Sequence, residues 1–333
     1  MAFYTYVFTA NIKGYKEKLH ALSEREGISY HKLWRDTIYC VVKYGMALSD
    51  YLNYEFWKKT KKERRSYAGV RLQNDFYEKV SPSKYKKRYT VKPDFQTEFI
   101  EFTKRKFVVP ERESIDKVNE FIDSHEDFIL KPVEDWGGGK DVSKVKCADI
   151  EDRQKFYDDC IANHLFLEEV ITQHPEMNRL CPTSCNTIRI MTFNNKGKAE
   201  VLDAYLRVGN GENVVDNFHA GGTVTPIDTK TGKLVGNALD KDLKEFEFHP
   251  MTGVKFDGFQ IPYYNEVVEM VKKAALMGDK ILVIGWDVTI APDGPVIIEA
   301  NRRPGFDGVQ VASKRGRKDL MRHCLRELGM LKK

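Results

Sequence analysis

Residues 285–301 read GWDVTIAPDGPVIIEAN, and this stretch decides the fold. Two runs suited to β-strands flank residues 292–294 (Pro-Asp-Gly), which are typical of a tight turn. If these three residues form the loop, Asp287 lies opposite Glu299 on the neighbouring strand. Because side chains alternate along a strand, Asn301 shares a face with Glu299. The stretch therefore predicts a hairpin on which two carboxylates and an amide oxygen converge.

The facing carboxylates of this hairpin predict a bound cation. Like charges directly opposed across a sheet destabilise it, and a hard cation with oxygen ligands relieves the repulsion. Mg²⁺ commonly takes one or two carboxylates together with substrate phosphates, so Asp287, Glu299 and Asn301 form a candidate magnesium site. Two alternatives stay open. The acids are solvated at an exposed edge, or a two-residue turn shifts the register by one and separates them.

A glycine-rich loop follows an earlier β-like run. The run spans residues 128–133 and contains Lys131, and the loop at residues 135–141 reads DWGGGKD. Consecutive glycines let backbone N–H groups approach a phosphate without an intervening Cβ, and Lys131 adds a cation. The loop is not a Walker P-loop, because Asp141 follows Lys140 where that motif requires Ser or Thr. A flexible hairpin tip is the alternative interpretation.

Two arginines lie in apolar runs between the loop and the hairpin. Arg189 lies within residues 186–190 (NTIRI), Arg207 ends another run, and residues 215–222 (VDNFHAGG) follow it. An arginine inside a β-run usually has an anionic partner, which is either a transferring phosphoryl group or a structural carboxylate. His219 is a candidate base or a structural side chain.

In this chain order the motifs resemble the ATP-grasp superfamily. The hairpin, continued by residues 302–305 (RRPG), is similar to the magnesium hairpin of that family. Residues 187–189 and 217–222 resemble the branch that adds amino acids to protein or peptide carboxylates. The resemblance extends over about residues 30–310 and is strongest to the sugar-transfer-associated ATP-grasp proteins, which carry a similar N-terminal helical region. Many members begin instead with a parallel α/β domain, so the substrate is the least transferable inference.

The resemblance implies that these motifs bind ATP and Mg²⁺. The residues implied to contact the nucleotide are Lys92, Lys131, Gly137, Gly138, Gly139, Glu168, Glu169, Val170 and Ile171. Within this set Lys131 contacts the α- and β-phosphates, the glycines close over the phosphates, and residues 168–171 form the hinge strand that binds adenine and ribose. The residues implied to face the γ-phosphate and the acyl phosphate are Arg189, Arg207 and Asn217. The implied Mg²⁺ ligands are Asp287, Glu299 and Asn301. Lys92 is assigned as the first nucleotide lysine in a stretch that also contains Lys87, Lys104 and Lys106.

We expect an α+β protein with the ATP-grasp fold, in which the nucleotide lies between two α+β lobes. The predicted domains are a basic, mainly helical region at residues 1–90, a small lobe at 91–170 and a large lobe at 171–333. Largely antiparallel sheets are predicted from β-like runs at residues 128–133, 165–171, 187–193, 201–208, 281–290 and 296–300. Helices are predicted within residues 32–54 and at 114–125, 264–277 and 317–328. The basic run at residues 58–65 is either a solvated helix face or a docking site for an anionic partner such as a membrane surface.

Composition is ordinary for a globular enzyme. The 333 residues are 41% hydrophobic and 31% charged, with a formal net charge of +5. This mild excess suits an anionic substrate and lacks the concentrated basic face of a dedicated nucleic-acid binder. Six scattered cysteines without a C-x-x-C pair indicate reduced thiols. With no signal peptide or membrane-spanning run, we expect a cytoplasmic protein for which peripheral membrane contact stays open. The oligomeric state is not predicted.

The predicted function is a carboxylate–amine ligase. A substrate carboxylate attacks the γ-phosphate, and an amine attacks the resulting acyl phosphate to give an amide, ADP and phosphate. The family suggests a substrate related to polysaccharide or another glycoconjugate. One alternative is a kinase that phosphorylates a hydroxyl at the same site. Another is a non-catalytic ATP-binding regulatory module, against which the presence of Lys131 and all three hairpin ligands speaks. No motif supports a nucleic-acid binder.

Overall fold

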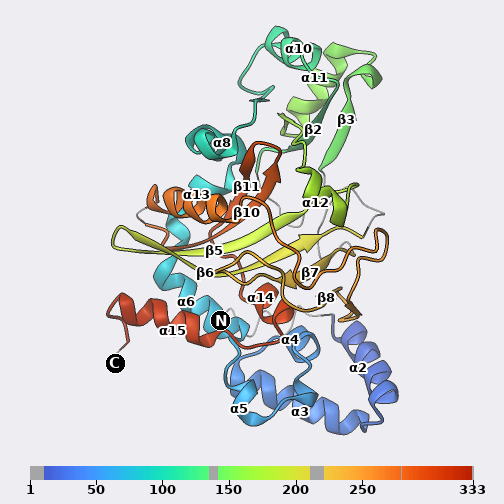
Figure 1. Cartoon of the computed structure of the whole chain (residues 1–333), viewed down its shortest axis with the longest axis vertical. Coiled ribbons are helices and arrows are strands. Elements are labelled where there is room, and N and C mark those ends of the chain that lie inside the picture. The colour runs from blue at the N-terminus through green and yellow to red at the C-terminus, as the bar shows by residue number, and fades with distance from the viewer. Residues whose placement is uncertain (1–10, 135–141, 211–220, 279, 332–333) are drawn as a thin grey trace. The chain divides into compact units, whose positions relative to one another are not determined.

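The computed structural model describes residues 11–134, 142–210, 221–278 and 280–331. These residues form two compact units, whose helices and strands are drawn in Figure 1. Unit 1 contains the described residues up to Ser81, Asp242–Lys244 and the chain from Gly305 onward, and unit 2 contains the rest. The domain boundaries at residues 90 and 170 stay predictions.

Unit 1 is helical, as predicted for the N-terminal region. Its elements are α2 (Ile12–Glu26), α3 (Tyr30–Tyr44), α4 (Leu48–Asn53), the 3₁₀ turn η1 (Phe56–Lys58), α5 (Lys61–Arg64), α6 (Val70–Val80), α14 (Asp307–Ala312) and α15 (Lys318–Glu327). The helix predicted within residues 32–54 is found as α3 and α4. They are separated at Gly45, which has a left-handed φ of 66° and ends α3.

The helices of unit 1 are amphipathic, and their apolar faces form its core. On α3 the buried residues Leu33, Thr37 and Val41 are spaced four apart and lie on one face. The Tyr15 hydroxyl of α2 lies 2.9 Å from the Thr37 hydroxyl, which joins the two helices. On α15 the buried residues are Met321, Cys324 and Leu325, whereas Arg322 and Arg326 are exposed.

Unit 2 contains two antiparallel sheets. The four-stranded sheet has the order β1-β4-β2-β3 and the seven-stranded sheet the order β11-β10-β5-β6-β7-β8-β9. The strands are β1 (Phe107–Val108), β2 (Asp127–Pro132), β3 (Ser143–Lys146), β4 (Leu165–Glu169), β5 (Thr187–Asn195), β6 (Lys198–Val208), β7 (Thr223–Pro226), β8 (Ala238–Leu239), β9 (Glu245–Phe246), β10 (Val283–Ala291) and β11 (Gly294–Asn301). The helices and 3₁₀ turns are η2 (Ser83–Tyr85), α7 (Lys87–Thr90), α8 (Lys92–Glu98), α9 (Ile100–Thr103), α10 (Ile115–Asp123), η3 (Cys147–Asp149), α11 (Arg153–Ala162), α12 (Pro175–Leu180) and α13 (Tyr264–Leu276).

The prediction of an α+β fold with antiparallel sheets is confirmed. Every predicted strand and helix is found with ends that differ by a few residues. The sequence did not reveal β1, β3, β7, β8 and β9, because strands this short carry too few alternations to be recognised.

Each sheet of unit 2 has its own apolar core. Helices α10 and α11 pack on the four-stranded sheet through residues such as Phe121 and Cys160 around Phe128. Helix α13 covers one face of the seven-stranded sheet, where Val267 and Val271 contact a core that includes the fully buried Trp286 (Figure 1). The opposite face of that sheet is therefore the one available for polar groups.

No helix among the described residues combines the length and hydrophobicity needed to cross a bilayer. All six cysteines lie in the described chain and carry free thiols, as predicted.

Candidate functional site

The structure pairs Asp287 with Glu299 across β10 and β11, as the sequence predicts. The turn that connects these strands is shorter than predicted. Ala291 pairs with Gly294, so only Pro292 and Asp293 form the loop. The prediction of a three-residue loop is wrong, and a two-residue turn by itself would have separated the two acids.

A β-bulge at Ile298 reconciles the short turn with the predicted pairing. Val288 pairs with Ile297, whereas Asp287 pairs with Glu299, so Ile298 is the extra residue on the bulged strand. This added residue cancels the one-residue shift that the turn introduces. The two carboxylates are thereby returned to opposite positions.

The acids and the two arginines share the sheet face opposite α13. Trp286 and Val288 belong to the core that α13 covers, so alternation along β10 places Asp287 on the other face. Arg189 on β5 and Arg207 on β6 follow the same alternation. The core residues that flank these arginines are Ile188, Ile190, Leu206 and Val208.

Asp287 is the centre of a buried charge network, which we call the Asp287 cluster (Asp287, Glu299, Arg189 and Arg207). Its side chain is 1% exposed. Arg189 donates from Nε to Oδ1 and from Nη2 to Oδ2, the latter at 3.0 Å, and Arg207 Nη2 donates to Oδ2 at 2.9 Å. Arg207 Nε also donates to Thr187 Oγ1 at 2.8 Å. In this structure the anionic partner of both arginines is a protein carboxylate.

The two carboxylates of this cluster have opposite pKa shifts. Burial by itself raises the pKa of Asp287, but the charges of Arg189 and Arg207 outweigh burial and lower that pKa to about 2. Burial and the neighbouring charge of Asp287 raise the pKa of Glu299. Asn301 Nδ2 donates to Glu299 Oε1 at 3.2 Å. Glu299 therefore lies where additional positive charge would be stabilising.

A second buried network, which we call the Glu168 cluster, forms around the four-stranded sheet. It consists of Glu168, Lys131, Arg105 and Gln96. Lys131 Nζ and Gln96 Nε2 donate to the Glu168 carboxylate, and Arg105 Nη1 donates to Oε1 at 2.9 Å. Glu168 is 3% exposed, Arg105 5% and Lys131 7%. Because these three side chains are so deeply buried, the stability of each charge depends on the opposite charge of its partners.

Arg105 connects the two clusters. Its Nη2 donates to the carbonyl oxygens of Ile297 and Ile298 at 3.1 and 3.0 Å, and both carbonyls belong to the bulged part of β11. Arg105 is not among the site residues predicted from the sequence. It lies between exposed Lys104 and Lys106 in a run of cations, and only the structure reveals its burial.

The candidate nucleotide lysines lie near each other. Burial lowers the pKa of Lys131, and the charges of Arg105 and Lys92 act in the same direction, whereas Glu168 opposes them. For Glu168, burial raises the pKa but Arg105 and Lys131 outweigh it, so the net shift is downward. Lys92 begins α8 and lines a small recess together with Gln96 and Glu299.

The predicted hinge residues separate into two environments. Glu168 is engaged in its cluster, whereas Glu169 is half-buried and accepts the backbone N–H of Lys106 at 3.0 Å. Val170 and Ile171 follow the end of β4 and are also half-buried. Four of the predicted site residues lie outside the described residues: Gly137, Gly138, Gly139 and Asn217. His219 lies outside them as well.

A model of the sugar-transfer associated ATP-grasp family matches residues 86–325. The chain belongs to this family. The match covers the two sheets of unit 2 and the hairpin with its facing acids, and it begins after the helices α2–α6. No curated protein matches this ATP-grasp chain in sequence.

Solved structures similar to this ATP-grasp chain are ligases. One is the ATP-grasp ligase PsnB complexed with a phosphomimetic variant of its minimal precursor, Mg and ADP. It is 14% identical, with a TM-score of 0.45 over 74% of this chain and 60% of that chain. Another is a RiPP-associated ATP-grasp ligase from Chryseobacterium gregarium, which is 10% identical with a TM-score of 0.45 over 79% of this chain and 69% of that chain. A third is the D-alanine-D-alanine ligase from Coxiella burnetii, at 11% identity and a TM-score of 0.41 over 71% and 56% of the respective chains. The chain thus spans less than two thirds of the PsnB ligase.

The ATP-grasp hairpin has the donor chemistry that Mg²⁺ requires. Asp287 and Glu299 supply carboxylate oxygens, and the amide of Asn301 lies within hydrogen-bonding distance of Glu299. Within the described ranges, no group of three or more His, Cys, Asp and Glu side chains is arranged to hold a metal. Because one carboxylate already raises the pKa of the other, a divalent cation fits this position.

Proposed function

We propose that this ATP-grasp chain is an ATP- and Mg²⁺-dependent carboxylate–amine ligase. A carboxylate oxygen of the substrate bonds to the γ-phosphorus of ATP while the bond to the leaving ADP breaks. The nitrogen of an amine then bonds to the acyl carbon, phosphate leaves, and the amine loses a proton. The observation that carries the proposal is the connection of two charge clusters through Arg105. One cluster suits phosphates and the other suits a cation.

Nucleotide binding is assigned to the four-stranded sheet and its neighbours. Lys131 and Lys92 place positive charge near each other, which suits the α- and β-phosphates. We assign Gly137, Gly138 and Gly139 to the phosphates because backbone N–H groups without side chains can approach closely. Glu169, Val170 and Ile171 are assigned to adenine and ribose, with Glu168 holding Lys131 in place.

Metal binding is assigned to Asp287, Glu299 and Asn301. When bound there, Mg²⁺ would neutralise charge on the phosphates during transfer. The protein contributes the opposed strands that hold the two carboxylates and the bulge that sets their register. Arg105 binds the carbonyls of the bulge and so keeps this hairpin close to Lys131.

Arg189, Arg207 and Asn217 are assigned to the γ-phosphate and the acyl phosphate. Both arginines are paired with Asp287. A bound cation would draw the Asp287 carboxylate toward itself and leave the guanidinium groups with N–H donors for phosphoryl oxygens. The ion pairs hold both guanidinium groups beside the hairpin acids.

The family name, sugar-transfer associated, supports a substrate linked to polysaccharide or another glycoconjugate. The helical unit 1 distinguishes this chain from members of the wider ATP-grasp superfamily that begin with a parallel α/β domain. We therefore assign substrate recognition to surfaces outside the two charge clusters. The substrates we propose are acids and amines of the glycoconjugate class.

The experiment measures ATP turnover with Mg²⁺ across a panel of sugar acids and amines, with ADP and free phosphate followed separately. A ligase releases both products only when an acid and an amine are present. Asp287→Asn lowers this turnover by about 100-fold. The matched control is Asp293→Asn, which changes an exposed aspartate in the turn of the same hairpin and leaves turnover unchanged.

The other outcomes identify the alternatives. ADP release without free phosphate, accompanied by a stable phosphate ester, assigns the site to a kinase. Mg²⁺-dependent ATP binding without turnover on any acid and amine of the panel supports a regulatory module. Absence of ATP binding contradicts every role assigned above.

A further inference from the structure

One cavity of unit 1 is strongly basic. It encloses about 550 Å³ and is lined by seven Lys and Arg residues but only two acidic residues. The cations come from two segments far apart in the sequence: Lys59 and Arg65 beside α5, and Lys314, Arg315, Lys318, Arg322 and Arg326 in and before α15. We call this cavity the basic pocket. Every residue that lines it belongs to unit 1, whereas both charge clusters belong to unit 2.

The two walls of the basic pocket are held together by a rigid frame. Lys318 N donates to Ser66 O at 2.9 Å, and Tyr67 Oη donates to Lys314 O at 2.7 Å. Gly316 packs so closely on Ser66 that a Cβ on this glycine would lie 2.2 Å from the Ser66 carbonyl carbon. These contacts fix the backbone of the two walls relative to each other, so the positions from which the basic side chains extend are set by the fold.

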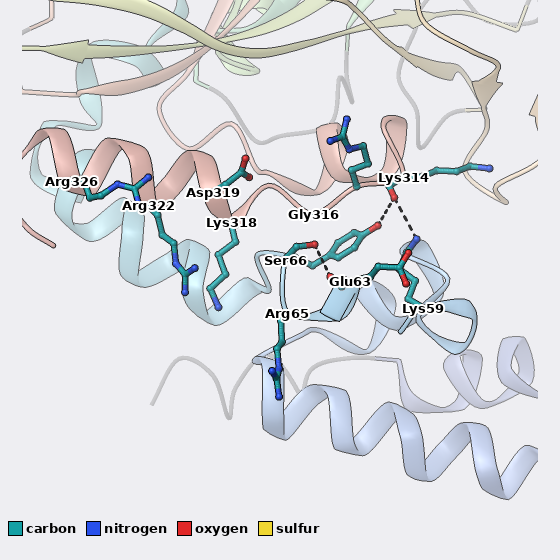
Figure 2. A pocket seen from close by; sticks show the side chains of 12 residues that line it. Lys59, Glu63, Arg65, Ser66, Lys314, Gly316, Lys318, Asp319, Arg322 and Arg326 are labelled. Carbon is teal, nitrogen blue, oxygen red and sulfur yellow. Dashed lines mark hydrogen bonds between the residues drawn. The ribbon is translucent and has the colours of Figure 1, made fainter. Parts of the chain in front are cut away.

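Most cations of the basic pocket are not neutralised by the protein. Within the part of the chain that the structure describes, Arg65, Lys318, Arg322 and Arg326 form no ion pair. Glu63 is occupied at the start of α5, where its carboxylate accepts from Thr60. Figure 2 shows the Asp319 side chain pointing away from those of Lys318 and Arg322.

The arrangement on α15 is unfavourable without a ligand. Lys318, Arg322 and Arg326 are four residues apart, so like charges lie on one helix face and repel each other. Lys318 is also at the N-terminal end of α15, where the helix dipole disfavours a cation. Burial and the charge of Arg322 lower the pKa of Lys318. A bound anion would remove each of these costs.

We propose that the basic pocket binds a phosphorylated group that carries at least two phosphates, either a soluble small molecule or a lipid headgroup. The excess of cations over acids calls for several negative charges on one ligand, and two walls of guanidinium groups suit phosphate oxygens. The volume is that of a small-molecule site. An extended acidic peptide would need a longer groove. This proposal goes beyond the ligase function and does not depend on it.

The test uses the full-length chain and tripolyphosphate, measured by isothermal titration calorimetry without added metal. In the double variant Arg322→Gln/Arg326→Gln, two exposed pocket residues lose their charge, and the dissociation constant rises about tenfold or more. The matched control is Lys61→Gln/Lys62→Gln, which removes the same charge from exposed positions of α5 outside the pocket lining. The control binds as the wild type does.

A third variant and a vesicle arm complete the test. Arg65→Gln, on the opposite wall, also weakens tripolyphosphate binding. If tripolyphosphate were bound by α15 alone, this variant would bind it as tightly as the wild type does. Co-sedimentation with phosphatidylcholine vesicles that contain diacylglycerol pyrophosphate distinguishes a lipid headgroup from a soluble ligand. If the wild type sediments with these vesicles and the pocket variants do not, the ligand is a headgroup. If the pocket variants lose only the binding of tripolyphosphate, the ligand is soluble. Equal weakening in the pocket and control variants overturns the proposal. So does binding that no pocket variant changes, or binding of neither probe.

Discussion

The Glu168 and Asp287 clusters solve the same physical problem with different numbers of charges. Each buries a carboxylate whose pKa would rise on burial and lowers that pKa with two cations. The Glu168 cluster has one acid and two cations, whereas the Asp287 cluster has two acids and two cations. The first therefore keeps an excess positive charge that suits phosphate, and the second keeps a carboxylate that suits Mg²⁺. The ratio of acidic to basic side chains, more than the residue types, therefore distinguishes the two clusters.

Removal of Glu168 is expected to have the largest effect. Glu168→Ala leaves Lys131 and Arg105 buried without a counter-charge and lowers the free energy of unfolding by about 3–5 kcal/mol. Urea unfolding followed by the fluorescence of buried Trp286 measures this change. The control, Glu169→Ala, changes the half-buried neighbour and costs less than about 1 kcal/mol. Equal costs for the two variants would contradict the existence of a buried cluster.

Asp50 of unit 1 is a buried carboxylate that, among the described residues, forms no ion pair. In contrast to the carboxylates of the two clusters, it should therefore make the free energy of unfolding depend on pH near neutrality. Burial raises the pKa of Asp50 to about 7, although its Oδ2 accepts the Ala47 N–H at 2.8 Å. The ordinary value is 3.8, so the stabilising proton is fully bound below pH 3.8 and is lost as pH rises through 7. Asp50→Asn should gain about 4 kcal/mol relative to the wild type between pH 4 and pH 8, as measured by urea unfolding at each pH. Asp75→Asn, an exposed control, should leave the profile unchanged.

Neutralising Asp287 is expected to cost less than deleting Glu168. Asp287→Asn keeps the shape of the side chain but weakens three charge-assisted hydrogen bonds to Arg189 and Arg207, at a cost of about 2 kcal/mol in unfolding free energy. These arginines are also less deeply buried than the partners of Glu168. The same variant was assigned a loss of turnover above. A variant as stable as Asp293→Asn would show that the arginines do not depend on Asp287.

Glu299→Gln is expected to have the smallest effect and the opposite sign. It removes a carboxylate that Asp287 repels and raises the free energy of unfolding by about 0.5 kcal/mol without Mg²⁺. Thermal unfolding with Mg²⁺ and ADP should then show no metal-dependent rise in Tm, whereas the wild type shows one. Destabilisation in metal-free buffer would mean that Glu299 serves the fold and not a cation.

Much of unit 2 could be predicted from the sequence because its signals are local. The hairpin, the strands and α13 have regular alternation or helical periodicity over many residues, and the pairing of Asp287 with Glu299 followed from that alternation. The loop length was wrong, because no local signal marks Ile298 as a bulge. Two compensating one-residue errors therefore left the predicted pairing intact.

The partners of the candidate site residues were less predictable. Arg105 and Gln96 contact Glu168 across sequence separations of 63 and 72 residues, which no periodicity encodes. The sequence left phosphate and a structural carboxylate as alternative partners of Arg189 and Arg207, and in the structure both pair with the carboxylate of Asp287. The run at residues 58–65 divides similarly: Arg64 pairs with Asp36, whereas Lys59 and Arg65 line the basic pocket.

The bulge at Ile298 accommodates one residue more than the two-residue turn requires. If β11 kept this residue but continued as a regular strand, Ile298 would lie opposite Asp287, and Glu299 would point toward α13. If Ile298 were deleted, Glu299 would follow Ile297 directly and would still lie opposite Asp287, but one of the two carbonyl groups that Arg105 binds would be lost. The hairpin can therefore keep its facing acids at two chain lengths, and the longer one offers both carbonyls to Arg105.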